Sequence, residues 1–189
     1  MKSLFTILFV ISSYLGFAQN TSNKNSETRE FIEEATFTQI NRDWTLTAEF
    51  ESGIGETITF FPVEVIDLKS NKSIKALEMD MNIEYEFMGK KRKYFKSSWI
   101  DLDEIDELII FLESYVMPNL KNILEKKQSK VFVFNSRELK FEFGIEEKDD
   151  RKISVYLKDF GSIDDEHYFW TRTQVNKLPK LLEMLKQIK

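Results

Sequence analysis

The sequence predicts an α+β fold in which two related antiparallel sheet-plus-helix units, each with a ββββα-like order, pack in one compact chain. Apolar residues recur at three- and four-residue spacing in two long segments, near residues 102–116 and 172–188. Each segment follows several short runs in which apolar and polar residues alternate, as in half-buried strands. We therefore place the first unit at residues 31–127 and the second unit at residues 128–189.

The N-terminal eighteen residues have the pattern of a signal peptide. Lys2 supplies a positive charge, an apolar run extends from Leu4 to Leu15, and small residues precede a cleavage site near Ala18/Gln19. The run is shorter than the roughly 20 residues of a membrane-spanning helix. We expect a periplasmic or secreted protein without a transmembrane span. Residues 19–30 are polar and are expected to form a flexible leader.

The composition is that of a globular chain, with 42% hydrophobic and 31% charged residues. The formal net charge of −5 argues against nucleic-acid binding over the whole surface. Cysteine is absent, and a chain of 189 residues can fold on its hydrophobic core without disulfides. We expect no cofactor, and we expect a partner in the envelope or the extracellular space.

The segment Trp99–Leu112 predicts a strand that turns directly into a helix. Asp101 is a suitable N-cap, and Glu104 three residues later completes a capping box in which each side chain accepts from an unpaired backbone N–H. Further carboxylates in the first turn complement the positive end of the helix dipole. The predicted buried face consists of Leu102, Ile105, Leu108, Ile109, Leu112, Tyr115 and Val116.

The rest of the first unit is predicted to consist of strands and short turns. Pro62 indicates an edge position or a bulge in its strand, because proline cannot donate a ladder hydrogen bond. Residues Gly89–Lys93 are predicted to form a basic hairpin tip, and Pro118 to end or kink the helix. Strands are predicted at residues 37–40, 43–51, 57–68, 74–87 and 94–100, and a second short helical piece at residues 118–127.

The second unit is predicted to repeat this order. A shift of seventy residues aligns Ile83 with Ile153 and Leu108 with Leu178 without a gap. The same shift places Thr171-x-x-Gln174 on the first capping box, so we predict a duplication. The predicted elements are strands at residues 131–134, 138–144, 152–157 and 167–171, and a helix at residues 172–188.

Two resemblances follow from these patterns. The order of strands and helices is similar to the duplicated ββββα arrangement of the Whirly single-strand-binding fold, at the level of topology and without a diagnostic motif. The motif Trp99-Ile-Asp-x-Asp-Glu-Ile after a basic hairpin resembles exported proteins of unassigned role, over residues 74–116. The first resemblance implies a fold and single-strand binding, and the second implies no activity.

No residue pattern in the sequence predicts a catalytic, metal or cofactor site. The acidic cluster after Trp99 lacks the ligand spacing and the glycine of a calcium loop. His167 is the only histidine, too few for a zinc site in a chain without cysteine, and no Gly-x-Ser-x-Gly elbow presents a serine nucleophile. Paired carboxylates for glycoside hydrolysis stay open, because spacing in sequence does not give their distance in space.

Two candidate contact surfaces remain. The basic cluster is a candidate for contact with an anionic surface, and its alternative is a solvated hairpin that protects a strand edge from aggregation. Tyr168 and Trp170 alternate with Phe169, so they share one face of a strand and are a candidate aromatic binding surface, with burial in the core as the alternative. The basic cluster consists of Lys90, Lys91, Arg92, Lys93 and Lys96.

These observations favour an exported globular protein that serves as a non-enzymatic binding or envelope-associated module. The first alternative is a hydrolase that uses paired carboxylates, which requires an acidic cleft with perturbed carboxyl groups. The second alternative is a single-strand nucleic-acid-binding-like module, which requires a basic groove with stacked aromatic side chains. Net negative charge and export make nucleic acid the less favoured ligand.

Overall fold

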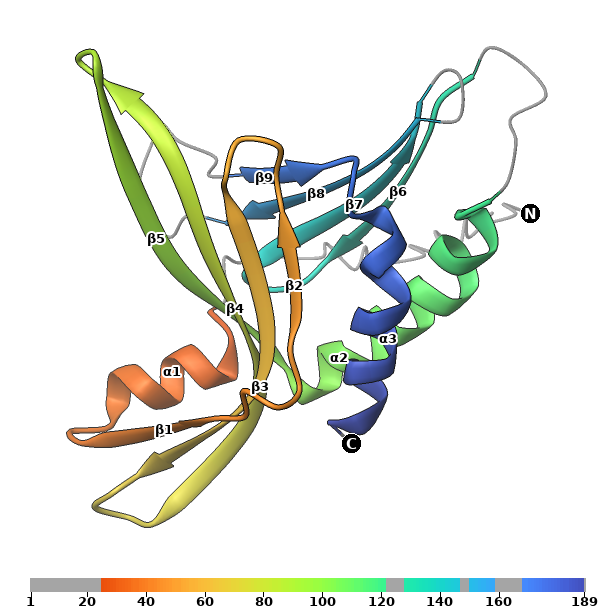
Figure 1. Cartoon of the computed structure of the whole chain (residues 1–189). Helices are drawn as coiled ribbons and strands as arrows, with labels where there is room; N and C mark the ends of the chain where they lie inside the picture. Colours follow the sequence, from red (N-terminus) through yellow and green to blue (C-terminus); the bar gives the residue numbers. More distant parts are fainter. Residues whose placement is uncertain (1–24, 122–127, 147–149, 159–167, 189) are drawn as a thin grey trace, which may run out of the picture.

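The chain forms two antiparallel sheets and three α-helices within the part that the structure, a computed structural model, describes: residues 25–121, 128–146, 150–158 and 168–188 (Figure 1). This arrangement confirms the predicted α+β class with two sheet units. The predicted signal peptide, its cleavage site, His167 and most of the predicted helical piece at residues 118–127 lie outside the described residues. Export and duplication stay predictions.

Sheet A contains the strands of the first unit. The long strands β3 and β4 form its centre, β5 forms one edge, and β1 and β2 pair one after the other with the opposite edge of β3. The strand order β1-β3-β4-β5 therefore describes a meander with a divided edge strand. The strands are β1 (Thr38–Arg42), β2 (Ala48–Glu51), β3 (Thr57–Asp67), β4 (Lys72–Phe87) and β5 (Lys90–Asp101).

Pro62 explains why this edge strand is divided. It lies in β3, which is an interior strand of the sheet but has no strand partner on one side at Pro62, so the predicted edge position holds only locally. The Asp43 N–H donates to the Pro62 carbonyl at 3.0 Å, which shows that the Pro62 backbone faces the connection between β1 and β2. The donor that proline lacks is therefore missing where the neighbouring strand is interrupted. The strand predicted at residues 43–51 is accordingly shortened to β2.

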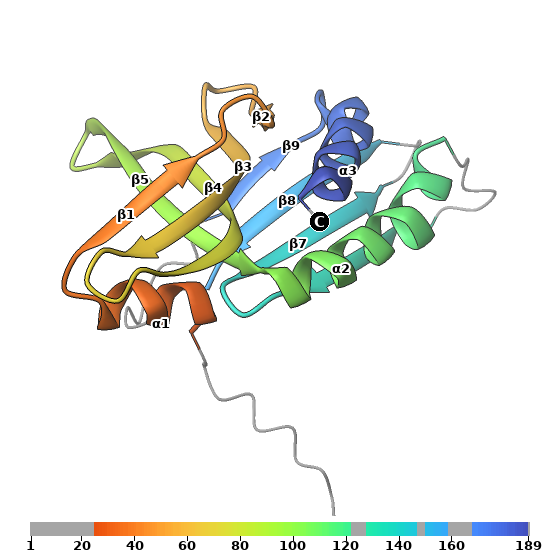
Figure 2. The ribbon, with the colours of Figure 1, turned by 90° about the horizontal axis from the view of Figure 1, so that it is seen from below.

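Sheet B contains the strands of the second unit in the order β6-β7-β8-β9. Helices α2 and α3 lie against one face of this sheet (Figure 2). The polypeptide follows α2 with a wider π-helical turn at Leu112–Val116 and a 3₁₀ turn at Met117–Asn119, which contains Pro118. The elements are α2 (Leu102–Phe111), β6 (Lys130–Asn135), β7 (Leu139–Ile145), β8 (Arg151–Leu157), β9 (Tyr168–Thr171) and α3 (Leu178–Gln187).

Helix α2 begins immediately after Asp101, and the predicted capping box is present. Its predicted apolar face is buried except at two positions, because Leu102 is 45% exposed and Tyr115 is 52% exposed. In the first turn of α2, the buried side chain is Glu104, which contacts Arg137, and Leu102 points to the surface. Tyr115 lies in the π-helical turn, where the extra residue per turn shifts later side chains away from the 3.6-residue period.

Helix α3 begins later than predicted. A 3₁₀ turn at Val175–Lys177 precedes it, and no helix starts at Thr171. Gln174 does not form the predicted capping box, since its side-chain oxygen accepts from the Glu51 N–H at 3.0 Å. Pro179 lies in the first turn of α3, where its missing N–H costs no helical hydrogen bond.

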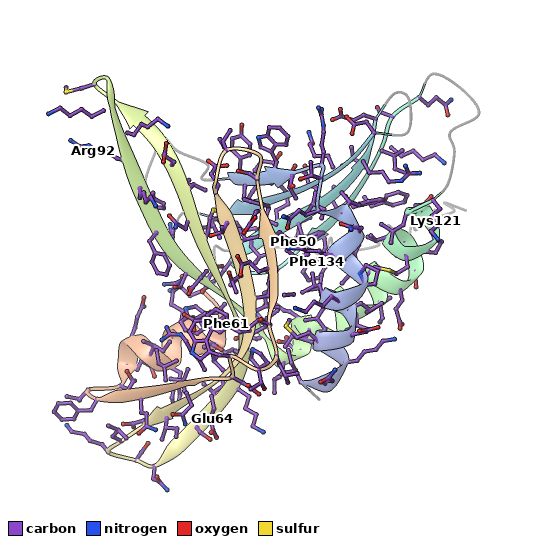
Figure 3. The ribbon with its side chains drawn as sticks, viewed as in Figure 1. Phe50, Phe61, Glu64, Arg92, Lys121 and Phe134 are labelled. Carbon is purple, nitrogen blue, oxygen red and sulfur yellow. The ribbon has the colours of Figure 1, made fainter. Side chains whose placement is uncertain are left out.

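One hydrophobic core joins both units. Figure 3 shows Phe50 of sheet A and Phe134 of sheet B in the region between the two sheets. The cluster continues through Leu108 of α2 and Leu178 of α3, which are 1% and 0% exposed. A smaller cluster around Phe61 covers the opposite face of sheet A. The two units therefore fold as one body around a shared core.

The N-terminal segment contains a helix that the sequence did not predict. Helix α1 (Glu27–Glu34) packs Phe31 and Ile32 against the smaller cluster. Ser26 and Thr28 are fully buried, and the Ser26 hydroxyl oxygen accepts from the Arg29 N–H at 3.0 Å as an N-cap. The expected flexible leader is therefore wrong for residues 25–30.

Candidate binding face on the second sheet

The face of sheet B opposite the helices carries the predicted aromatic surface. Phe169 points into the core and is fully buried, whereas Tyr168 and Trp170 are 49% and 40% exposed. The alternation along β9 therefore places both predicted residues on the open face, and the alternative of burial in the core is wrong for them. We call this surface, which carries the outward side chains of β6 to β9, the open face.

Tyr156 extends this aromatic surface. It pairs with Tyr168 across β8 and β9, and the two rings stack with centroids 5.6 Å apart and planes tilted by 22°. The Arg172 guanidinium lies 5.6 Å from the centroid of the Trp170 ring. Alternation along β8 would have shown that Tyr156 faces outward, but its contact with Tyr168 depends on the register between the strands.

A cavity of about 320 Å³ lies on the open face beside the aromatic side chains. Ser154 lines it and pairs across the strands with both Glu142 and Trp170. Gly144 leaves space, because a Cβ added there would meet no atom closer than the Lys152 carbonyl oxygen at 3.9 Å. The lining residues are Ser129, Val131, Glu142, Gly144, Ile145, Glu146, Lys152 and Ser154.

The charges on the open face are paired with one another. Glu146 lies 3.2 Å from Lys152 and 2.8 Å from Arg172, and Lys140 lies 3.3 Å from Glu142. The hydrogen bond from Lys152 lowers the pKa of Glu146, so this carboxylate stays ionised at neutral pH. Burial, together with the nearby Glu142 carboxylate, raises the pKa of Tyr156, whose hydroxyl therefore stays neutral. The open face combines aromatic rings, hydrogen-bonding groups and little unbalanced charge.

The predicted basic cluster lies on a two-stranded ribbon formed by the ends of β4 and β5, and Figure 3 shows Arg92 near its far end. The turn itself consists of Met88 and Gly89, both with positive φ, so Lys90–Lys93 belong to β5 and not to the tip. Lys91 forms an ion pair with Glu84 at 2.6 Å. Alternation divides the cluster between both faces of the ribbon. Contact with an anionic surface stays a prediction.

A buried polar joint connects α1, α2 and the turn between β6 and β7. We define the polar joint as Arg29, Asp101, Glu104, Arg137 and Glu138. The Arg137 guanidinium lies 2.9 Å from Asp101 and 3.3 Å from Glu104, and it also contacts Asp103 at 2.6 Å. These three carboxylates lie within reach of a single cation. In this arrangement the guanidinium supplies the positive charge, and capping and ion pairing account for the cluster.

Glu104 makes the stability of this joint dependent on pH. Burial raises its pKa, although N–H groups of Arg137 and Asp101 donate to it at 2.6 and 3.2 Å. A raised folded-state pKa means that its contribution to stability is largest at low pH and falls as pH rises from the unfolded pKa of about 4.3 through the folded value. Urea unfolding at pH 4 and pH 7 measures this effect. We expect the difference in free energy of unfolding between wild type and Glu104→Gln to be smaller at pH 7 than at pH 4. An equal or larger difference at pH 7 would contradict the raised pKa.

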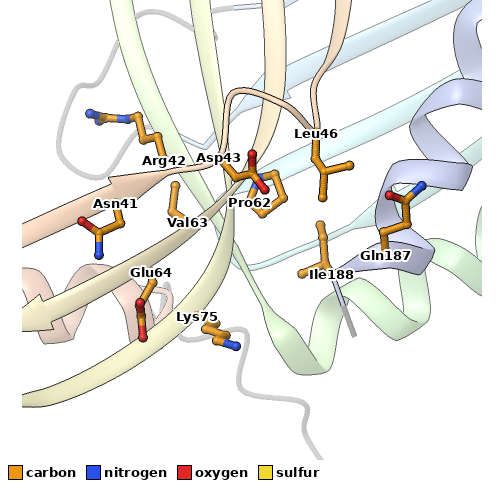
Figure 4. A pocket seen from close by; sticks show the side chains of 10 residues that line it. All are labelled: Asn41, Arg42, Asp43, Leu46, Pro62, Val63, Glu64, Lys75, Gln187 and Ile188. Atoms are coloured by element: carbon orange, nitrogen blue, oxygen red, sulfur yellow. The ribbon is translucent and has the colours of Figure 1, made fainter.

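Another cavity, of about 420 Å³, lies between the interrupted edge of sheet A and the end of α3 (Figure 4). Arg42, which lines it, forms a bidentate ion pair with the buried Glu78 at 2.8 and 2.9 Å. Pro62 and Leu46 supply apolar surface. None of the predicted contact residues lines this cavity, whereas Trp170 pairs directly with Ser154, which lines the cavity on the open face, so the open face of sheet B is the better candidate site.

Comparison of the chain with family models, curated proteins and solved structures gives no match. The described helices include none that is long and apolar enough to span a bilayer. The functional argument therefore depends on the geometry and chemistry of the chain itself.

Proposed function

We propose that this chain is a non-enzymatic binding module, exported to the envelope or the extracellular space, whose ligand lies on the open face of sheet B. The observation that carries the proposal is the exposed pair Tyr168 and Trp170 beside a cavity lined by Ser154. Exposed aromatic side chains next to a hollow with a few polar groups are typical of ligand sites. The opposite face of the sheet is already buried under α2 and α3.

The chemistry of the open face favours an uncharged, polyhydroxylated ligand such as a saccharide chain. The rings of Trp170 and Tyr168 offer flat apolar surface to the C–H face of a sugar ring. Glu142 and Lys152 offer an acceptor and a donor at the cavity, where hydroxyl groups of the ligand would lie. Because the cations are paired with carboxylates, a polyanion gains little electrostatic attraction.

The two alternatives receive less support from the same residues. A hydrolase needs a carboxylic acid that stays protonated, but the pKa of Glu146 is lowered, and the raised pKa of Glu104 belongs to the polar joint. A single-strand nucleic-acid binder would use the aromatic rings of the open face as a stacking platform. It also needs unpaired cations along the backbone track, and Lys152 and Arg172 are engaged with Glu146.

Replacing Trp170 with alanine is expected to weaken saccharide binding about 5- to 150-fold, if the lost stacking surface is worth the roughly 1–3 kcal/mol that an aromatic platform contributes to the binding of a nucleic-acid base. Isothermal titration calorimetry with a panel of neutral oligosaccharides, including β-1,4-glucan, chitin and xylan fragments, measures this change. Gly144→Val should also reduce binding by filling the cavity, since there is room for its Cβ at this position. The matched control is Tyr115→Ala, which removes an exposed aromatic ring from the π-helical turn that follows α2.

The outcome separates the candidate functions. Binding of an oligosaccharide that Trp170→Ala and Gly144→Val weaken, and Tyr115→Ala does not, supports the proposal. Binding of single-stranded DNA with a steep salt dependence, and of no oligosaccharide, would replace it with the nucleic-acid alternative. Release of shorter sugars during the titration would show a hydrolase.

A further inference from the structure

The ribbon formed by β4 and β5 extends beyond the rest of sheet A (Figure 1). The pairing of β3 with β4 begins at Thr57 and Asn82, so β3 supports no residue of β4 after Asn82. In this part of the sheet β4 and β5 pair only with each other among the described residues. The outer edge of β5 is therefore a strand edge on a projecting element.

The hydrogen bonds at the base of β5 show which residues face this edge. The Trp99 N–H donates to Glu138 at 3.0 Å, and the Ser97 carbonyl accepts from Arg29 at 3.4 Å. Backbone groups of alternate residues point to the same side of a strand, so those of Phe95 and Lys93 also point away from β4. Glu138 and Arg29 close the base of the edge. On the side away from β4, no described residue forms a backbone hydrogen bond with Phe95 or Lys93.

A cavity of about 470 Å³ lies beside this edge, between α1 and β5. Its apolar lining comes from Ile32 of α1, Ile40 of β1 and Trp99 of β5. Phe95 also lines it and is 65% exposed. Phe95 and Trp99 lie on the same face of the strand, so a strand added at the edge would direct alternate side chains toward the cavity.

The charges along the edge select the occupant. Lys93 lies on the same face as Phe95 and opposite Glu84 on β4. Glu84 forms its ion pair with Lys91, and no described residue forms an ion pair with Lys93, so Lys93 keeps room for a second carboxylate. A second copy of β5 would bring a further set of basic side chains to this edge, which like-charge repulsion disfavours. A partner strand with an acidic side chain two residues from an apolar side chain would place the carboxylate opposite Lys93 and the apolar side chain in the cavity.

We propose that an extended segment of a partner protein adds as a strand to the outer edge of β5, with an acidic side chain opposite Lys93 and an apolar side chain in the cavity beside Phe95. Main-chain hydrogen bonds to the edge supply affinity, and the cavity and Lys93 supply selectivity. This site is separate from the open face of sheet B, and it does not depend on the saccharide proposal.

The test uses a displayed library of random heptapeptides and the chain from residue 19 to residue 189. Selection is expected to enrich peptides in which acidic and apolar residues alternate. The best peptide, made synthetically, is then titrated against variants. Lys93→Pro should weaken it at least about tenfold, because proline removes the outward N–H while edge strands tolerate proline. Lys93→Gln should cause a smaller loss of affinity. The loss of affinity in Phe95→Ala should depend on the apolar residue of the peptide.

Two controls make the result specific. Trp170→Ala alters only the open face and should leave the peptide affinity unchanged. The urea midpoint of Lys93→Pro should match that of wild type, because no described group pairs with the Lys93 N–H. Failure to enrich alternating peptides, or binding that Lys93→Pro leaves unchanged, would overturn the proposal. A wild-type dimer in sedimentation that Lys93→Pro dissociates would assign the edge to a second copy instead.

Discussion

Replacing Glu138 with alanine is expected to lower the free energy of unfolding by about 3–5 kcal/mol, the range found when one partner of a buried ion pair is removed. Glu138 is 1% exposed. It accepts from Arg29 Nε and Nη2, both at 2.7 Å, from the Ser26 hydroxyl at 2.5 Å and from the Trp99 N–H at 3.0 Å. The alanine variant would leave a half-buried guanidinium and several donors without an acceptor.

Urea unfolding monitored by circular dichroism measures the loss. Glu138→Gln is the matched variant, since it keeps the size of the side chain and one acceptor oxygen while removing the charge, and its loss should be smaller. Hydrogen exchange should show faster exchange at residues 27–34 in the alanine variant, because Arg29 would no longer hold α1. A loss below about 1 kcal/mol, with unchanged exchange in α1, would show that Glu138 does not hold the joint.

The position of Glu138 explains this large effect. It lies in the turn between β6 and β7. Its carboxylate accepts from the Trp99 N–H at the edge of β5 and from the hydroxyl of Ser26, the residue before α1. One side chain therefore connects the N-terminal helix, sheet A and sheet B. The cost of burying its charge is offset by six donors, which is the condition under which a buried carboxylate is tolerated.

Local patterns predicted most of the secondary structure because they act within a few residues. The capping box of Asp101 and Glu104 predicted the start of α2, and the alternation of apolar and polar residues predicted β4 and β7. Helix α1 was missed although Ser26 is a suitable N-cap with acidic residues in the first turn. Its sequence is polar, and the groups that hold it, Glu138 and Asp101, are more than seventy residues away.

The candidate site shows the same division between local and distant information. Alternation with Phe169 predicted that Tyr168 and Trp170 share a face. It did not predict the stacking of Tyr156 on Tyr168, the space above Gly144 or the ion pairs of Glu146, because these depend on which strands are neighbours and in which register. The basic hairpin was misplaced for a similar reason, since the turn at Met88 and Gly89 is fixed by the pairing of β4 with β5.

Asp101→Ala is expected to cost about 2–4 kcal/mol, more than the roughly 1 kcal/mol of an isolated N-cap. The additional loss arises because this carboxylate also caps α1, where it accepts from the Glu27 N–H at 2.7 Å and the Thr28 N–H at 3.1 Å. The Thr28 hydroxyl donates to it at 2.7 Å, and Arg137 lies 2.9 Å away.

Urea unfolding of Asp101→Ala and Thr28→Val separates the two roles of Asp101. Thr28→Val removes only the hydroxyl donor and should cost about 1 kcal/mol, while Asp101→Ala should lose the caps of both helices. If Asp101→Ala costs no more than Thr28→Val, the contacts of the carboxylate other than that with the Thr28 hydroxyl contribute nothing measurable. A loss of about 1 kcal/mol with faster exchange in α2 alone would show that only the α2 cap contributes. A loss near the upper end, with faster exchange in the first turns of both α1 and α2, would show that one carboxylate fixes the start of two helices that are distant in sequence.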